Sequence, residues 1–175
     1  TTPASEMTNE GFRVSTRTNK SRADLFNNDD TGVQRINTEV FFFSGHGNSG
    51  LIQFYDDSTL TTGAVPNLYR MKLAVLAGCE TGLGSDSIAQ RFSTNGAFAS
   101  VGWTTTTTVG SSRTFTNTFF KEMDDGRTVL QACETAKSKL LWPFDGARNY
   151  RIFGDSGYFF LPQITWNASS ASASN

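Results

Sequence analysis

Three uninterrupted apolar runs constrain the fold of this chain more than any other feature of its sequence. They cover residues 39–44 (EVFFFS), 71–78 (MKLAVLAG) and 97–103 (AFASVGW). A short apolar run without alternation is typical of a β-strand that is buried on both faces. Segments with helical spacing lie between the runs, so strands and helices alternate along the chain. The alternation predicts an α/β fold with a mostly parallel central sheet flanked by helices.

Helix signals support this interpretation. Ser85 is the expected N-cap of a short helix that carries Ile88 and Phe92. Apolar residues that recur every four positions predict an amphipathic helix over residues 112–123. A capping-box pattern at Thr128 and Gln131 predicts the start of a further helix. Weaker signals predict strands over residues 11–16, 51–55 and 151–162, and a polar, helical stretch from Ser21.

Length and composition indicate one globular domain. The 175 residues are enough for a single core. We expect the domain to cover residues 11–162, between a flexible N-terminal tail (1–10) and a polar C-terminal tail (163–175). The net charge is -1 and no basic cluster is visible, so a nucleic-acid partner is not expected. No apolar run approaches the ~18 residues of a membrane span, so a membrane partner is not expected either.

The chain contains one histidine and two cysteines, which limits the metal and disulfide chemistry available to it. These residues are too few for a structural zinc site or a disulfide framework, although one disulfide remains arithmetically possible. We therefore expect no metal and no cofactor. The start at Thr1 fits proteolytic processing or trimming and gives no indication of the compartment.

Two of the apolar runs end in residues that can carry chemistry. His46 lies between Gly45 and Gly47 after the first run, and Cys79 follows the second run directly. If the two strands are parallel neighbours, both side chains emerge at one edge of the sheet, as a nucleophile and a base do in a cysteine peptidase. The amides of Gly47 and Cys79 are then the candidates for an oxyanion hole. The alternative is that His46 is an ordinary surface residue and Cys79 a small buried one.

The motifs around these residues resemble a known family. SGHG at residues 44–47 and LAGCETGLGS at residues 76–85 are similar to the CHAT branch of the caspase-like (clan CD) cysteine peptidases. The similarity continues through NGAFASVGW (95–103), the two following helical segments and the Gly-Asp of RIFGDSGYFF, and covers residues 39–161. The resemblance implies a caspase-like three-layer sandwich. It also implies a cysteine endopeptidase that cleaves protein or peptide substrates through an acyl-enzyme on Cys79, with His46 as general acid and base.

Further residues are candidates for binding the substrate. In caspase-like enzymes the substrate adds as an extended strand beside the segment that here begins with Trp103 and Thr104, although this segment can equally be an edge strand running into a polar loop. Asp155 and Asp86 can line a pocket for a basic side chain, which predicts cleavage after Lys or Arg. Asp86 is equally explained as a charge at a helix start.

Two other expectations concern Cys133 and the sheet edge. Cys133 lies in a Gln-Ala-Cys triplet like that of caspases, but it shares an apolar helix stripe with Val129, and we expect it in the core. Caspase-like sheets have additional strands before the one that ends in His-Gly, and residues 1–38 offer only one. We therefore expect an open sheet edge that another polypeptide covers, either an N-terminal fragment or a second copy of the chain.

Two other classes of function compete with the peptidase hypothesis. A catalytically silent caspase-like domain would act as an interaction or assembly module. A flavodoxin-like binding domain fits the predicted layers but leaves His46 and Cys79 unexplained.

Overall fold

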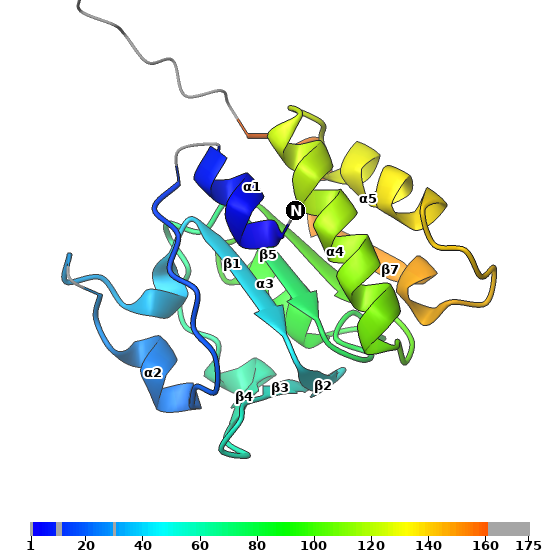
Figure 1. The fold of residues 1–175 in the computed structure, drawn as a ribbon. Helices are drawn as coiled ribbons and strands as arrows, with labels where there is room; N and C mark the ends of the chain where they lie inside the picture. The colour runs from blue at the N-terminus through cyan, green and yellow to red at the C-terminus, as the bar shows by residue number, and fades with distance from the viewer. Residues whose placement is uncertain (1, 10–11, 30, 161–175) are drawn as a thin grey trace, which may run out of the picture.

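A four-stranded sheet forms the centre of the computed structural model, which describes residues 2–9, 12–29 and 31–160 (Figure 1). Its order is β1-β5-β6-β7. The bounds are Val40–Ser44 for β1, Leu73–Ala77 for β5, Ala99–Trp103 for β6 and Tyr150–Gly154 for β7. The first three strands are parallel and β7 runs antiparallel to β6. The three apolar runs are therefore the three parallel strands, and the predicted α/β fold with a mostly parallel sheet is confirmed.

Helices cover both faces of the sheet. On one face lie α1 (Pro3–Asn9), α4 (Val109–Asp124) and α5 (Val129–Ser138), and on the other lie α2 (Arg22–Phe26) and α3 (Ile88–Thr94). The alternation of β5 divides the core in two, because Leu73, Val75 and Ala77 pack toward α4 and α5 while Ala74 and Leu76 pack toward α3. This is the three-layer arrangement expected of a caspase-like fold.

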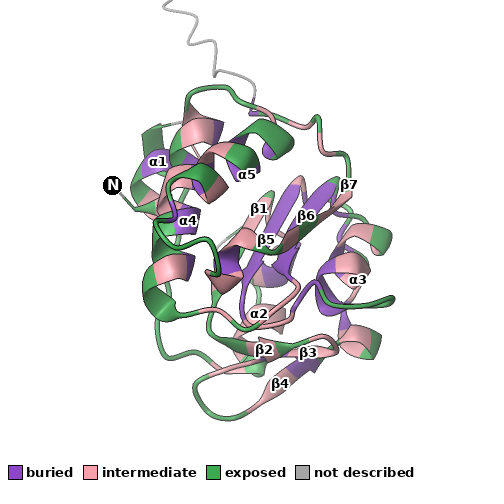
Figure 2. Cartoon of the chain, turned by 90° about the vertical axis from the view of Figure 1, so that its right-hand side faces the viewer, coloured by how far each residue is buried: buried purple, intermediate pink, exposed green. Residues whose placement is uncertain are grey.

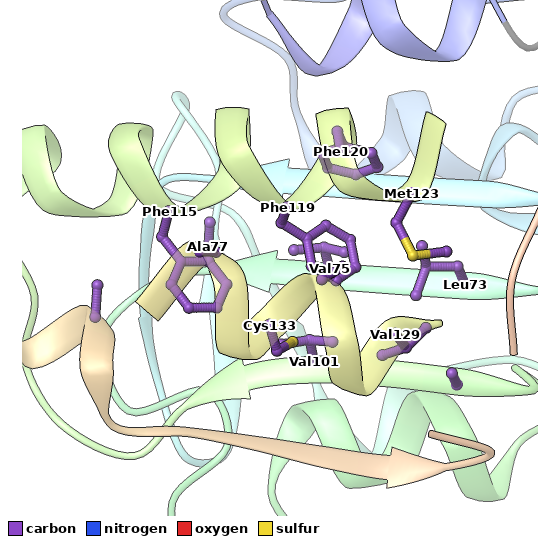
Figure 3. Close-up of a cluster of buried hydrophobic side chains, with 14 of the residues drawn as sticks. Leu73, Val75, Ala77, Val101, Phe115, Phe119, Phe120, Met123, Val129 and Cys133 are labelled. Atoms are coloured by element: carbon purple, nitrogen blue, oxygen red, sulfur yellow. The ribbon is translucent and has the colours of Figure 1, made fainter. Parts of the chain in front are cut away.

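The middle of the sheet is the best-buried part of the molecule. Every residue of β5 and β6 is buried (Figure 2). Phe115, Phe119 and Met123 of α4 point onto the strands from above, and Cys133 of α5 lies among them (Figure 3). A scaffold packed in this way holds the loops at the strand ends in fixed positions.

A small antiparallel sheet follows β1. It consists of β2 (His46–Asn48), β3 (Leu51–Gln53) and β4 (Thr59–Thr61), in this order. Ile52 and Leu60 anchor it because both are fully buried in the cluster that contains α3. Three short 3-10 helices complete the described elements: η1 (Arg35–Asn37), η2 (Thr62–Ala64) and η3 (Gly146–Arg148).

The N-terminal segment differs from the expectation of a flexible tail. Residues 3–9 form α1, which packs against α4 and buries Glu6 and Met7. By contrast, residues 12–16 have no regular structure, so the strand expected over 11–16 is absent from its described part. Sequence reasoning missed α1 because one turn of apolar contact is too little to show a period. The C-terminal tail expected at 163–175 lies outside the described residues.

Of the two predicted N-caps, Thr128 is confirmed and Ser85 is wrong. Ser21 caps α2 with a capping box, and Thr128 and Gln131 form the capping box of α5. The α3 helix begins later than expected, with Ser87 and not Ser85 as its N-cap. The α4 helix begins earlier, after an N-cap at Thr108. Each shift is small because hydroxyl residues within a few positions of a helix start can compete for the same amides.

β1 is the edge strand of the main sheet. Its residues are partly buried or exposed, so the expectation that this strand is buried on both faces is wrong. The carbonyl of Glu39 accepts from the amide of Leu73, and the amide of Gly45 donates to Ala77. In a parallel ladder the alternate residues Val40, Phe42 and Ser44 must then direct their backbone groups away from β5. No strand in the described ranges pairs with that side, and Phe42 is 38% exposed.

No described helix is both long and apolar enough to cross a membrane.

Candidate active site

His46 and Cys79 emerge side by side from the main sheet. Ser44 of β1 is paired with Ala77 of β5, and His46 and Cys79 each follow two residues later. The hydrogen bond from the Gly45 amide to the Ala77 carbonyl, 3.4 Å long, carries the pairing one residue further. The parallel register therefore brings the two residues to the same edge, as the sequence predicted.

Glycines let the His46 and Cys79 loops approach each other closely. A Cβ atom on Gly47 would lie 2.8 Å from the methyl carbon of Thr81 and 3.6 Å from the carbonyl oxygen of Cys79. A Cβ atom on Gly78 would lie 3.1 Å from the Gly45 oxygen and 3.4 Å from the Gly47 nitrogen. Side chains at these positions would push the two loops apart. The glycines at positions 47 and 78 thus serve the contact between the loops.

The two candidate catalytic side chains have different surroundings. His46 begins β2, opposite Gln53 of β3, and is exposed to solvent. Cys79 is partly buried, and its sulfur lies 3.5 Å from the amide nitrogen of Thr107, which donates to it. No hydrogen bond between the imidazole and the thiol is present among the described residues. Such bonds often form only when a substrate is bound, so this geometry is compatible with a catalytic pair.

Thr81 holds the Cys79 loop through buried hydrogen bonds. Sequence reasoning did not identify this residue. Its buried hydroxyl donates to the carbonyls of Leu76 (2.7 Å) and Gly78 (3.0 Å) and accepts from the amide of Trp103 (3.3 Å). Its methyl group faces Gly47 and Gly78. Thr81 therefore joins the ends of β5 and β6 to the His46 loop. The only sequence signal was its place two residues after the cysteine.

The backbone directly after Cys79 has an unusual conformation. Glu80 has a φ of 59°, in the left-handed region that favours glycine. Its amide donates to the carbonyl of Thr105 at 3.2 Å, which ties the Cys79 loop to the segment after β6. The backbone hydrogen bonds of the described residues include none donated by the Cys79 amide. That amide is thus available to a ligand, as an oxyanion-hole donor must be.

The segment after β6 reaches the thiol, but its first two residues do not have the surroundings expected of a substrate site. The side chain of Trp103 is completely buried against Phe115, so it cannot contact a peptide bound at the surface. Both the amide and the hydroxyl of Thr104 donate to the carbonyl of Asn149 (2.8 and 3.1 Å). Thr107 is the residue of this segment for which a hydrogen bond with the Cys79 sulfur is found.

The two aspartates proposed to bind a basic side chain are not brought together. Because β7 is antiparallel to β6, Asp155 follows Gly154 at the end of the sheet where β6 begins, and its amide donates to Phe98. It therefore lies at the opposite end of the sheet from Cys79, contrary to expectation. Asp86 follows Cys79 in the chain, but Arg91 pairs with its carboxylate at 2.5 Å. Neither residue therefore provides an unpaired carboxylate at the end of the sheet where Cys79 lies.

Cys133 is a core residue, as predicted. It is completely buried on α5, and burial raises the pKa of its thiol well above the ordinary value. A thiol with a raised pKa that is out of contact with solvent is a poor nucleophile. Both cysteines are free, so the arithmetically possible disulfide is not formed. Within residues 2–9, 12–29 and 31–160, no group of three or more His, Cys, Asp and Glu residues could hold a metal ion.

Comparison with known proteins supplies a family for this geometry. The model of peptidase family C25 matches residues 4–157, which is most of the chain. The match includes both loops that carry His46 and Cys79, and it extends to α1. No curated protein matches the sequence. The matched family agrees with the expected caspase-like cysteine peptidase, but it gives no support to the CHAT branch that the motifs suggested.

Proposed function

The chain belongs to peptidase family C25, a family of cysteine-type endopeptidases, and on this premise we propose that Cys79 and His46 form its catalytic dyad. The thiolate of Cys79 attacks the carbonyl carbon of the scissile peptide bond, and the carbonyl electrons move onto its oxygen. The amide of Cys79, with that of Gly47, stabilises this oxyanion. His46 protonates the leaving amine, the C–N bond breaks and a thioester remains. Water, deprotonated by His46, then releases the acid and the free thiol.

One observation carries this assignment above the others. His46 and Cys79 follow the paired residues Ser44 and Ala77 by the same number of positions, and this register supports a role for His46 as the base of Cys79. The single histidine of the chain and its one partly exposed described cysteine thus meet at one sheet edge. The backbone of Thr107 holds the thiol in place, because its amide donates to the sulfur and its carbonyl accepts from the thiol at 3.7 Å.

Labelling with a thiol-reactive peptide tests the proposal. An acyloxymethyl ketone on a short peptide should modify Cys79 and leave Cys133 unmodified, as peptide mapping by mass spectrometry would show. The same warhead without a peptide is the control, because a merely exposed thiol would react with both reagents alike. Equal inertness of both cysteines would instead support a catalytically silent interaction module.

We also propose cleavage after Lys or Arg, with a different carboxylate from those that the sequence suggested. Glu80 follows the nucleophile directly, is partly buried, and makes no ion pair or side-chain hydrogen bond within the described part of the chain. Asp86 is already paired and Asp155 is at the other end of the sheet. A partly desolvated, unpaired carboxylate favours a cationic side chain over a neutral one.

The open edge of β1 supports the expected second polypeptide. No strand among residues 2–9, 12–29 and 31–160 pairs with the outer side of β1, so an added strand would bind the backbone groups of Val40, Phe42 and Ser44 and cover Phe42. The partner is either an N-terminal fragment or a second copy of the chain. Native mass spectrometry of the purified protein distinguishes these two partners. A lone 19.1 kDa species that is stable at micromolar concentration would contradict both.

A further inference from the structure

A turn between α5 and η3 exposes large apolar side chains that the proposed chemistry does not use. Leu141 is 92% exposed, Trp142 74% and Phe144 94%. The sequence around them is LLWPFD, residues 140–145. Exposure of one large apolar residue is common, but three within four positions beside a functional loop commonly mark a binding surface.

The turn is held in a defined shape. The amide of Asp145 donates to the carbonyl of Trp142 at 3.1 Å, closing a β-turn with Pro143 at its second position, where proline fixes the backbone. The Asp145 carboxylate accepts from the amide of Ala147 and from the hydroxyl of Ser111 on α4. The backbone of Trp142 and Phe144 is therefore already fixed. Binding of a ligand would cost little free energy for ordering this turn.

Hydrogen bonds connect this turn to the nucleophile. The Thr105 hydroxyl donates to the Gly146 carbonyl at 3.1 Å, and a Cβ atom on Gly146 would lie only 1.8 Å from the Thr106 oxygen. The next residue, Thr107, donates to the sulfur of Cys79. Gly146, two residues after Phe144, and residues 105–107 thus connect the turn to the thiol. An extended peptide advances about 3.3 Å per residue, so a few residues of substrate are enough to reach from one to the other.

We propose that residues 141–144 form a substrate subsite that binds an apolar side chain a few residues from the scissile bond. The proposal rests on the proposed peptidase function. An apolar ligand is favoured because the exposed side chains are aliphatic and aromatic, while the one acidic group of the turn, Asp145, is already bonded to Ala147 and Ser111. A peptide is favoured over a second copy of the chain because the turn is joined to the loop that contacts Cys79.

The test measures kcat/KM on a cleaved peptide in which each flanking position is changed in turn between Phe and Ser. For the unaltered protein we expect one position, not adjacent to the cut, at which Ser lowers kcat/KM by about 10-fold. In the Trp142→Ala/Phe144→Ala variant that difference should shrink to less than about 2-fold. The control is Tyr69→Ala, which removes an exposed aromatic ring before β5, at the opposite end of the sheet.

A binding measurement separates the subsite from the chemistry. In Cys79→Ala, which binds without cleaving, fluorescence titration should show tighter binding of the Phe peptide than of the Ser peptide, and the turn substitutions should abolish the difference. Equal losses for both peptides would overturn the subsite while leaving the peptidase intact. A change from dimer to monomer in the turn variant, with unchanged peptide preference, would assign the turn to self-association and also overturn it. Absence of any cleavage or labelling of the unaltered protein would overturn the peptidase and the subsite together.

Discussion

The amide nitrogen of Thr107 lies 3.5 Å from the sulfur of Cys79, so the segment after β6 touches the candidate nucleophile. The site is therefore built from the ends of three neighbouring strands. β1 supplies His46, β5 supplies Cys79, and β6 leads to Thr107. This relationship places a loop that is far from Cys79 in the chain against its sulfur.

The two cysteines should separate cleanly by substitution. Cys79→Ala should reduce peptide cleavage to background with little change in the melting temperature, because it removes a partly exposed thiol at a strand end. Cys133→Ala should keep kcat/KM and lower the free energy of unfolding by about 1 kcal/mol, since a buried sulfur is lost. Steady-state kinetics and thermal denaturation measure both. Loss of activity in Cys133→Ala alone would reverse the assignment.

His46→Ala should lower kcat/KM by about 10²- to 10⁴-fold, the usual contribution of a general acid and base. The exposed position of His46 makes a stability effect small. Gln53→Ala is the matched control, because Gln53 pairs with His46 across β2 and β3 and loses only an exposed contact with Asp57. Equal activity in the two variants would remove His46 from the mechanism.

Thr81 should act through its hydroxyl. Thr81→Val keeps the shape of the side chain but removes its buried hydrogen bonds to the carbonyls of Leu76 and Gly78 and to the amide of Trp103, which should cost about 1–3 kcal/mol and slow cleavage by displacing Cys79. Thr81→Ser keeps the hydroxyl and should retain most of both properties. Chemical denaturation and kinetics compare them, and the role of the hydroxyl is wrong if Val and Ser variants behave alike.

Glu80 should set the preference for a basic residue before the cut. With matched Arg and Leu peptides, Glu80→Gln should reduce the Arg-to-Leu ratio of kcat/KM several-fold while leaving the Leu peptide little affected. Asp155→Asn is the control, because Asp155 lies at the other end of the sheet. A reduced ratio in Asp155→Asn with an unchanged ratio in Glu80→Gln would contradict the structural placement.

Stability should decline at alkaline pH through Tyr158. Burial, aided by the charge of Glu39, raises the pKa of Tyr158 to about 12 from its ordinary value of 10.0. The unfolded chain therefore loses this proton first, and stability that is complete below pH 10 is lost as the pH rises toward 12.

Denaturant titrations of Tyr158→Phe should show a shallower decline over that range. Burial and a hydrogen bond with Glu134 also raise the pKa of Tyr150, so part of the slope should remain until Tyr150 is changed too. An identical pH dependence in Tyr158→Phe and the unaltered protein would refute the assignment.

The sequence by itself determined the parallel strands, the capping box of α5 and the placement of His46 and Cys79 at one end of the sheet. Local sequence patterns indicate these features. The patterns are apolar runs ended by glycines, the capping box at Thr128, and the positions of His46 and Cys79 directly after two runs. Two parallel neighbours place their carboxyl ends together whatever the rest of the chain does. That geometric rule is why the pairing of His46 with Cys79 was predictable without coordinates.

Only the tertiary structure decided what surrounds that pair. The antiparallel direction of β7 sends Asp155 to the far end of the sheet, although its sequence resembles that of the other strands. Thr81 donates to the end of β5 and accepts from Trp103 of β6, and Gly146, which follows the turn at Trp142, accepts from Thr105 in the segment whose Thr107 contacts Cys79. Each of these contacts joins segments that are distant in the chain. Strand order and direction fix such contacts, and hydrophobic periodicity records which face of an element is buried but not which element lies against it.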